Sequence, residues 1–170
     1  MSVFSPNLSP KEVIQLGSFG GIYFYDNEGK INIDYKEFPS EWFDGLNESQ
    51  FKSKKYNRKI NYFKVKSGLS QKEWEEKGWI NNQDPRGWFQ WYCRYYIGRR
   101  TDDDKRQIQR WNNFCGEKGR WRNYIYSKIY NKGTSIDDLS FSLAVRQSLL
   151  HWAYMINEDD YNMWKLKNGI

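Results

Sequence analysis

Aromatic side chains outnumber aliphatic ones in this chain, and this ratio constrains the fold more than any other feature of the sequence. Nine Trp, thirteen Tyr and ten Phe stand against 26 Leu, Ile and Val together and only two Ala. Aromatic rings bury large apolar areas, and Tyr and Trp each carry a polar atom as well. Because the aliphatic residues are too few to fill a core alone, we expect most of the aromatic side chains to pack inside the protein.

The length of 170 residues is typical of one domain, and no internal repeat or Gly/Ser/Pro-rich linker divides the chain. We therefore expect a single domain over 1–170. It should have an α/β-hairpin part at 9–80, an aromatic-rich helical part at 84–156, and flexible ends at 1–8 and 158–170.

Composition excludes several classes of protein. The mean hydropathy is −0.98, and no apolar run approaches the ~18 residues that a membrane span needs. The segment Met1–Asn7 lacks the basic and apolar parts of a signal peptide. Cys93, Cys115 and His151 are too few for a disulfide framework or a classical zinc site. We expect an intracellular protein, in the cytoplasm, the nucleus or a virion, with no membrane partner and no cofactor.

The first half of the sequence predicts a short helix and a β-hairpin. A Ser-Pro-Lys-Glu capping box at 9–12 starts the helix, and Gly17 ends it. Two apolar-rich segments at 22–25 and 30–34 flank the turn sequence Asp-Asn-Glu-Gly at 26–29, which is typical of an antiparallel hairpin.

Between the hairpin and residue 80 the pattern is mixed. Short helical turns are expected over 38–65, and 62–66 could add a strand. A second capping box at 70–73 predicts another short helix that ends at Gly78.

The second half is helical in pattern, with start and stop signals at regular intervals. Four short helices are expected to begin near Asp84, Thr101, Arg120 and Ser142, and the first three to end before Gly98, Gly116 and Gly133. The predicted fold class is α+β and mostly α, with a small antiparallel β-hairpin packed on a C-terminal bundle of about four short helices.

The net positive charge of the chain is concentrated in one segment. Residues 86–132 hold 12 basic and 4 acidic side chains, whereas residues 1–85 are neutral overall and residues 133–170 have a net charge of −2. Because Arg binds phosphates in a bidentate manner and stacks on bases, this segment has the composition of a nucleic-acid surface. The side chains expected to contact phosphates are Arg94, Arg99, Arg100, Arg106, Arg110, Arg120, Arg122 and Lys128. The alternative is a solvated face whose charges pair with carboxylates of the same chain.

Aromatic residues accompany these charges. Four of them fall at helical spacing on one face and are expected to form core: Trp88, Trp91, Tyr92 and Tyr95. One or two tryptophans should remain exposed for stacking on bases, the candidates being Trp88, Trp91, Trp111 and Trp121.

Features that could indicate an enzyme are weak. The glycine loop 17–21 follows a helix and precedes a predicted strand, the reverse of phosphate-binding loops, so a tight turn is favoured. His151 lies among apolar residues and suggests a buried structural role. A Glu-x-Lys at 75–77 falls on a predicted helix, and the acidic triplets at 102–104 and 158–160 would need oxygens from a second element to hold Mg²⁺.

Several longer motifs together indicate a family. They are LGSFGGIYF at 16–24, FPSEWFDGL at 38–46, WEEKGWI at 74–80, DPRGWFQWYCR at 84–94, GRRTDD at 98–103 and VRQSLLHWAY at 145–154. In this order they resemble an uncharacterised protein family of fungi, algae, other microbial eukaryotes and large DNA viruses. The resemblance covers about 9–154 and implies a stand-alone intracellular protein. The chain also has 15 Asn with abundant Lys, Ile and Tyr, a bias that an AT-rich genome produces. Together with the resemblance, this bias points to a large DNA virus. The resemblance assigns no role to any residue.

The sequence as a whole favours a non-catalytic, nucleic-acid-binding protein that uses the 86–132 segment, with DNA preferred to RNA because of the viral context. The second hypothesis is a protein-interaction or virion-assembly component whose basic segment meets an acidic protein. The third is a nucleic-acid-processing enzyme that uses Asp102–Asp104 or His151.

Overall fold

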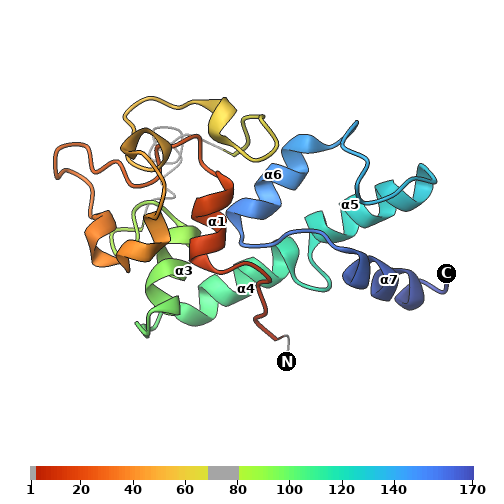
Figure 1. Ribbon diagram of the computed structural model, residues 1–170. Helices are drawn as coiled ribbons and strands as arrows, with labels where there is room; N and C mark the ends of the chain where they lie inside the picture. The colour runs from red at the N-terminus through yellow and green to blue at the C-terminus, as the bar shows by residue number, and fades with distance from the viewer. Residues whose placement is uncertain (1–2, 69–80) are drawn as a thin grey trace.

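The computed structural model describes residues 3–68 and 81–170, and all regular secondary structure in these residues is helical. Figure 1 shows α1 near the middle of the molecule, with the 3-10 turns η1 to η3 on one side and α5, α6 and α7 on the other. The α-helices are α1 (Pro10–Leu16), α3 (Trp88–Tyr96), α4 (Asp104–Cys115), α5 (Arg120–Asn131), α6 (Leu143–His151) and α7 (Glu158–Lys167). The 3-10 turns are η1 (Tyr35–Glu37), η2 (Ser40–Phe43), η3 (Glu48–Gln50) and η4 (Arg58–Ile60).

The predicted α+β class is wrong, because the described residues contain no β-strand and their fold is all-α. Residues 22–34 form successive turns in place of the hairpin, and Asn27 and Glu28 both adopt positive φ angles. The backbone N–H of Phe24 donates to Phe51 O at 2.9 Å and not to a facing strand. Tyr23 and Phe24 are both buried, whereas consecutive residues of a strand point to opposite faces. The turn conformation lets both rings enter the core.

The first helix agrees with its prediction. Ser9 Oγ accepts a hydrogen bond from Glu12 N at 3.2 Å, and Glu12 Oε1 accepts one from Ser9 N at 3.0 Å. These two bonds satisfy backbone donors that no earlier turn can serve. The helix ends at Leu16, before Gly17 with a φ of +84°.

The helices of the second half also form, with shifted limits. The helix expected to begin near Asp84 begins at Trp88. The helix expected to begin near Ser142 begins at Leu143 and ends at His151. Residues 158–170 were expected to be a flexible end, but 158–167 form α7, which Asn157 caps through a 2.9 Å hydrogen bond from Asp160 N to its Oδ1. The capping box predicted at 70–73, its helix and the Glu-x-Lys at 75–77 lie outside the described residues.

The core is aromatic, as the composition predicts. Trp91 is 0% exposed, and Trp88 and Tyr92 on the same face of α3 are also buried, so this face packs inside the protein. Phe4 inserts its ring among these side chains, with a centroid 5.7 Å from that of Trp91 and 5.2 Å from that of Trp111. Trp111 is buried as well and Trp121 is half-buried, so of the four candidates for base stacking only Trp121 reaches the surface.

Candidate nucleic-acid interface

Two of the predicted phosphate ligands, Arg94 and Arg99, lie at a charged cluster inside the fold. Arg94 is 7% exposed and donates to both carboxylate oxygens of Glu37, at 2.8 and 3.0 Å, and to Asp84 Oδ1 at 2.9 Å. Arg99 binds both oxygens of the same Asp84, at 3.0 and 2.7 Å. Asp84 itself is 1% exposed. These two guanidinium groups therefore hold distant segments together and leave the predicted phosphate-binding set.

Two more of the predicted ligands are paired at the surface. Arg106 binds both carboxylate oxygens of Asp103 one helical turn away, at 2.5 and 3.0 Å. Arg122 lies 3.4 Å from Asp160 and over the ring of Tyr154. Carboxylate partners within the chain, the alternative weighed for the basic segment, thus account for half of the eight predicted residues.

The other four have no ion pair with a described residue. Arg100 donates to the carbonyl of Tyr95 and lies 3.7 Å from the centroid of that ring. Arg110 donates to Gln107 and is half-buried, and this burial lowers the pKa of its guanidinium. Arg120 lies over Trp121, and Lys128 donates to the hydroxyl of Tyr124 at 3.2 Å. These cations are free to meet an external anion, but they are spread over α4, α5 and the loop after α3.

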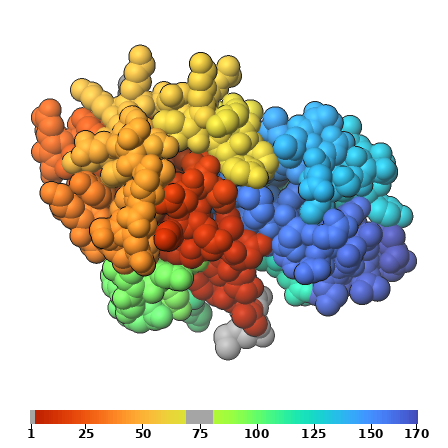
Figure 2. Space-filling view, viewed as in Figure 1, coloured from red at the N-terminus to blue at the C-terminus, as the bar shows by residue number. Residues whose placement is uncertain are grey.

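A denser group of free cations lies outside the predicted segment, on residues 52–66, here called the basic loop. Its seven cations are Lys52, Lys54, Lys55, Arg58, Lys59, Lys64 and Lys66, and no acidic residue occurs between Phe51 and Gly68. All of them except the half-buried Lys52 are exposed. Figure 2 shows this segment, in yellow-orange to yellow, along the upper edge of the molecule with side chains standing out into solvent. This run of basic residues is visible in the sequence itself. The net charge of residues 1–85 hides it, because acidic residues elsewhere in that segment balance the seven cations.

A buried asparagine fixes the conformation of the basic loop. Asn61 is 0% exposed, and its Oδ1 accepts a hydrogen bond from Gly20 N at 2.6 Å. Its Nδ2 donates to the hydroxyl of Tyr56 and to the carbonyl of Val65, both at 2.7 Å. These bonds join Asn61 to Tyr56 and Val65 within the loop and to Gly20 outside it. The backbone that bears the cations therefore has a defined conformation.

The basic loop packs against the glycine loop 17–21 and is hydrogen-bonded to it. Tyr62 N donates to Gly17 O at 2.7 Å, and Asn57 N donates to Gly20 O at 2.9 Å. A Cβ on Gly17 would collide with the carbonyl oxygen of Ile60, and one on Gly20 would collide with the ring of Tyr56. Both glycines also have positive φ, which other residues rarely adopt. The turn predicted here lets the glycine loop pack closely against the backbone of the basic loop at Ile60 and against the ring of Tyr56.

Helix α6 supports the same base from the other side. Gln147 is buried and donates to Ser18 O at 3.1 Å while it accepts from Phe63 N at 3.0 Å. His151 Nε2 lies 2.6 Å from Ser18 O, and its ring stacks on Phe19. Burial lowers the pKa of His151 to about 4, so the neutral ring donates this bond at pH 7. His151 is thus half-buried with its ring against the glycine loop, which is compatible with the structural role expected for it.

The acidic triplets also act within the fold. Asp104 accepts from Trp91 Nε1 at 2.8 Å and from Thr101 N at 3.0 Å. Asp160 accepts from the hydroxyl of Tyr154 at 2.6 Å. Among the described residues no group of three or more His, Cys, Asp or Glu side chains is placed to share a metal ion.

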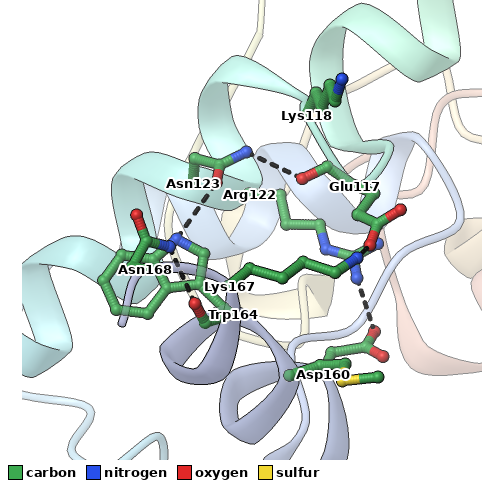
Figure 3. A pocket seen from close by; sticks show the side chains of 9 residues that line it. Glu117, Lys118, Arg122, Asn123, Asp160, Trp164, Lys167 and Asn168 are labelled. Atoms are coloured by element: carbon green, nitrogen blue, oxygen red, sulfur yellow. Dashed lines mark hydrogen bonds and ion pairs between the residues drawn. The ribbon is translucent and has the colours of Figure 1, made fainter. Parts of the chain in front are cut away.

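A cleft of about 470 Å³ lies between the α4–α5 loop, α5 and α7 (Figure 3). Its walls mix both signs of charge: Arg122 pairs with Asp160 and Lys167 with Glu117, and Lys118 also lines the cleft. Its polar groups are joined to one another, as in the 3.1 Å bond from Trp164 Nε1 to Asn123 Oδ1. Such a balanced wall offers no preference for an anion.

The basic loop is thus the strongest candidate site in the described residues. None of the described helices combines the length and the apolar character needed to span a bilayer. No protein-family model matches the chain, and neither a curated protein nor a solved structure matches it.

Proposed function

We propose that this protein binds nucleic acid without catalysis, and that the basic loop is its main contact surface. The observation that carries the proposal is the presence of seven cations on 15 consecutive residues with no acid among them. Lys and Arg side chains that reach phosphates release counterions, and this release supplies most of the affinity of sequence-independent binding.

Several basic side chains elsewhere in the molecule are paired with carboxylates, whereas four on the basic loop pair with no described carboxylate. Arg94, Arg99, Arg106 and Arg122 are each paired with a carboxylate. On the basic loop, the side chains of Lys54, Lys55, Arg58 and Lys59 have no hydrogen bond or ion pair with any described residue. Concentrated like charge destabilises the compact state through repulsion. A polyanion bound at the loop would offset this repulsion.

The geometry favours a binding role over a catalytic one. His151 is half-buried and its ring is bonded to Ser18 O. Asp103 pairs with Arg106, and Asp104 accepts a hydrogen bond from Thr101 N just before α4. Of the residues that the enzyme hypothesis names, His151, Asp103 and Asp104 thus already have partners within the fold. A preference for DNA over RNA remains part of the proposal and is tested by presenting both.

The test is a salt titration of binding to labelled oligonucleotides, with a matched pair of variants. In the first variant Lys54, Lys55, Arg58 and Lys59 are changed to Ala. In the second, four exposed lysines outside the loop are changed to Ala, namely Lys11, Lys30, Lys36 and Lys105. Both variants lose the same charge, so only the position of the charge differs between them.

We expect the loop variant to lose most of its affinity at low salt, and its slope of log K against log salt to shrink by about 3 to 4 units on duplex. The control variant should keep the parental slope within about one unit. Equal behaviour of the two variants would overturn the assignment to the loop. Absence of binding by the parent to any oligonucleotide would overturn nucleic-acid binding and leave an acidic protein as the partner.

A further inference from the structure

A second free cationic surface lies along α5. Arg120, Tyr124, Lys128 and Lys132 follow one another at intervals of four residues, so they form one ridge on the helix and its C-cap. We call these four residues the α5 ridge. Lys128 and Lys132 lie 5.8 and 5.0 Å from the ring centroid of Phe141. No carboxylate among the described residues forms an ion pair with the three cations of the ridge.

The α5 ridge adjoins the basic loop through the first turn of α6. Ser67, directly after the loop, donates its hydroxyl to Ala144 O at 3.0 Å and also contacts Ser148. Phe141, whose ring lies beneath Lys128 and Lys132, is two residues before the start of α6. Figure 1 shows α6 between the yellow loop and α5. A polyanion could therefore pass from the loop over the start of α6 to the ridge.

Each of the two surfaces leaves one tyrosine ring open to solvent. Tyr62 on the basic loop is 47% exposed, and Tyr124 on the α5 ridge is 42% exposed. The side chain of Tyr124 has Lys128 Nζ 5.5 Å from its ring centroid, and Tyr62 lies two residues from Lys64. Most rings in this protein are packed in the core, and Tyr62 and Tyr124 are two of the four exposed tyrosines among the described residues.

Exposed aromatic rings next to cations are the elements that bind unpaired bases. A base can stack on a tyrosine while its phosphates meet the neighbouring lysines, and this combination is common in proteins that bind single strands. In a duplex the faces of the bases are covered by their neighbours, and the rings would have no partner.

We infer that the nucleic acid is single-stranded and lies across both surfaces, with Tyr62 and Tyr124 stacking on its bases. The inference rests on the proposed function and adds to it the class of ligand and the path of the strand. Occupation of two linked surfaces also makes affinity depend on length, because a strand that reaches both gains avidity over one that reaches either alone.

The experiment compares short and long oligo-dT and oligo-U with a duplex of equal phosphate number, by fluorescence anisotropy at low salt. The variants are Tyr62→Ala, Tyr124→Ala and their Phe counterparts, which keep the ring. Tyr96→Ala is the matched control, since Tyr96 is 55% exposed on α3 with no lysine over its ring among the described contacts. Circular dichroism confirms that each variant is folded.

We expect the parent to bind long single strands more tightly than the duplex. Each of the two Ala variants should lose about 5- to 150-fold in affinity for single strands, the range measured for one stacked base. Duplex binding should change little, and the Phe variants should retain the parental affinity.

Equal affinity of the parent for single strands and duplex, or Ala variants that behave like Tyr96→Ala, would overturn this inference. The proposed function would survive that result if the Ala variant at Lys54, Lys55, Arg58 and Lys59 still lost binding. Failure of every oligonucleotide to bind would remove both.

Discussion

The buried cluster around Asp84 yields the sharpest prediction for stability. Replacing Asp84 with Ala removes the acceptor of three hydrogen bonds from guanidinium groups, at 2.9, 3.0 and 2.7 Å. Arg99 is then left with no carboxylate among the described residues, and Arg94, whose side chain is only 8% exposed, keeps Glu37 alone. Removing one partner of a buried ion pair costs about 3–5 kcal/mol, because the charges that it bound are left inside the protein with fewer partners.

That cost is a large part of the total free energy of unfolding, which is about 5–15 kcal/mol for a typical domain. For a chain of this size each kcal/mol lowers Tm by about 2–4 °C, so Asp84→Ala should melt about 6–20 °C below the parent. The assay is thermal unfolding followed by circular dichroism, together with urea unfolding for the free energy.

The matched control is Arg106→Ala, which removes a side chain that is 51% exposed and is the exposed member of the pair with Asp103. Exposed pairs contribute about 0–1 kcal/mol, so this variant should melt within a few degrees of the parent. If Asp84→Ala is no less stable than Arg106→Ala, Arg94 and Arg99 are solvated without Asp84, and burial does not set the cost of losing it.

Three further predictions follow from other buried groups. Trp91→Ala should lose about 3–5 kcal/mol in urea unfolding, since Trp91 is fully buried; a stable variant would contradict its place in the core. Asn61→Ala leaves Gly20 N without its acceptor and should cost about 1–3 kcal/mol and speed hydrogen exchange across 52–66, whereas unchanged exchange would show that other contacts shape the basic loop. The folded-state pKa of His151 is lowered from 6.5 to about 4, so its contribution to stability is complete above pH 6.5 and is lost as pH falls toward 4. His151→Gln should flatten the stability profile in that interval, and a profile as steep as the parent's would assign the pH dependence to other groups.

Local signals in the sequence predicted most of the helical structure. The capping box at Ser9 involves residues three apart, and the 3.6-residue period of the second half depends only on neighbouring turns. The buried face of α3 followed from composition, because a chain poor in aliphatic residues must use its rings as core. These features could be read without knowing the rest of the fold.

The errors arose where distant residues decide the outcome. The pattern at 22–34 matches a hairpin, yet the main chain of Phe24 is bound to Phe51 and its ring packs on Phe38 and Phe43. Arg94 looked free because its partner Glu37 is 57 residues away in the chain. The basic loop is not apparent from the charge distribution for a different reason. The net charge was taken over residues 1–85, a segment much longer than 52–66, and acidic residues elsewhere in it balance the loop.

The anchoring of the basic loop separates its shape from its charge. Its conformation depends on backbone atoms of the glycine loop and on the neutral amide of Asn61, while its cations project into solvent. The residues that specify this conformation are therefore different from the four cations whose side chains have no partner among the described residues, Lys54, Lys55, Arg58 and Lys59. Acidic residues at these four positions should leave the backbone of the loop intact and turn an anion-binding surface into a cation-binding one.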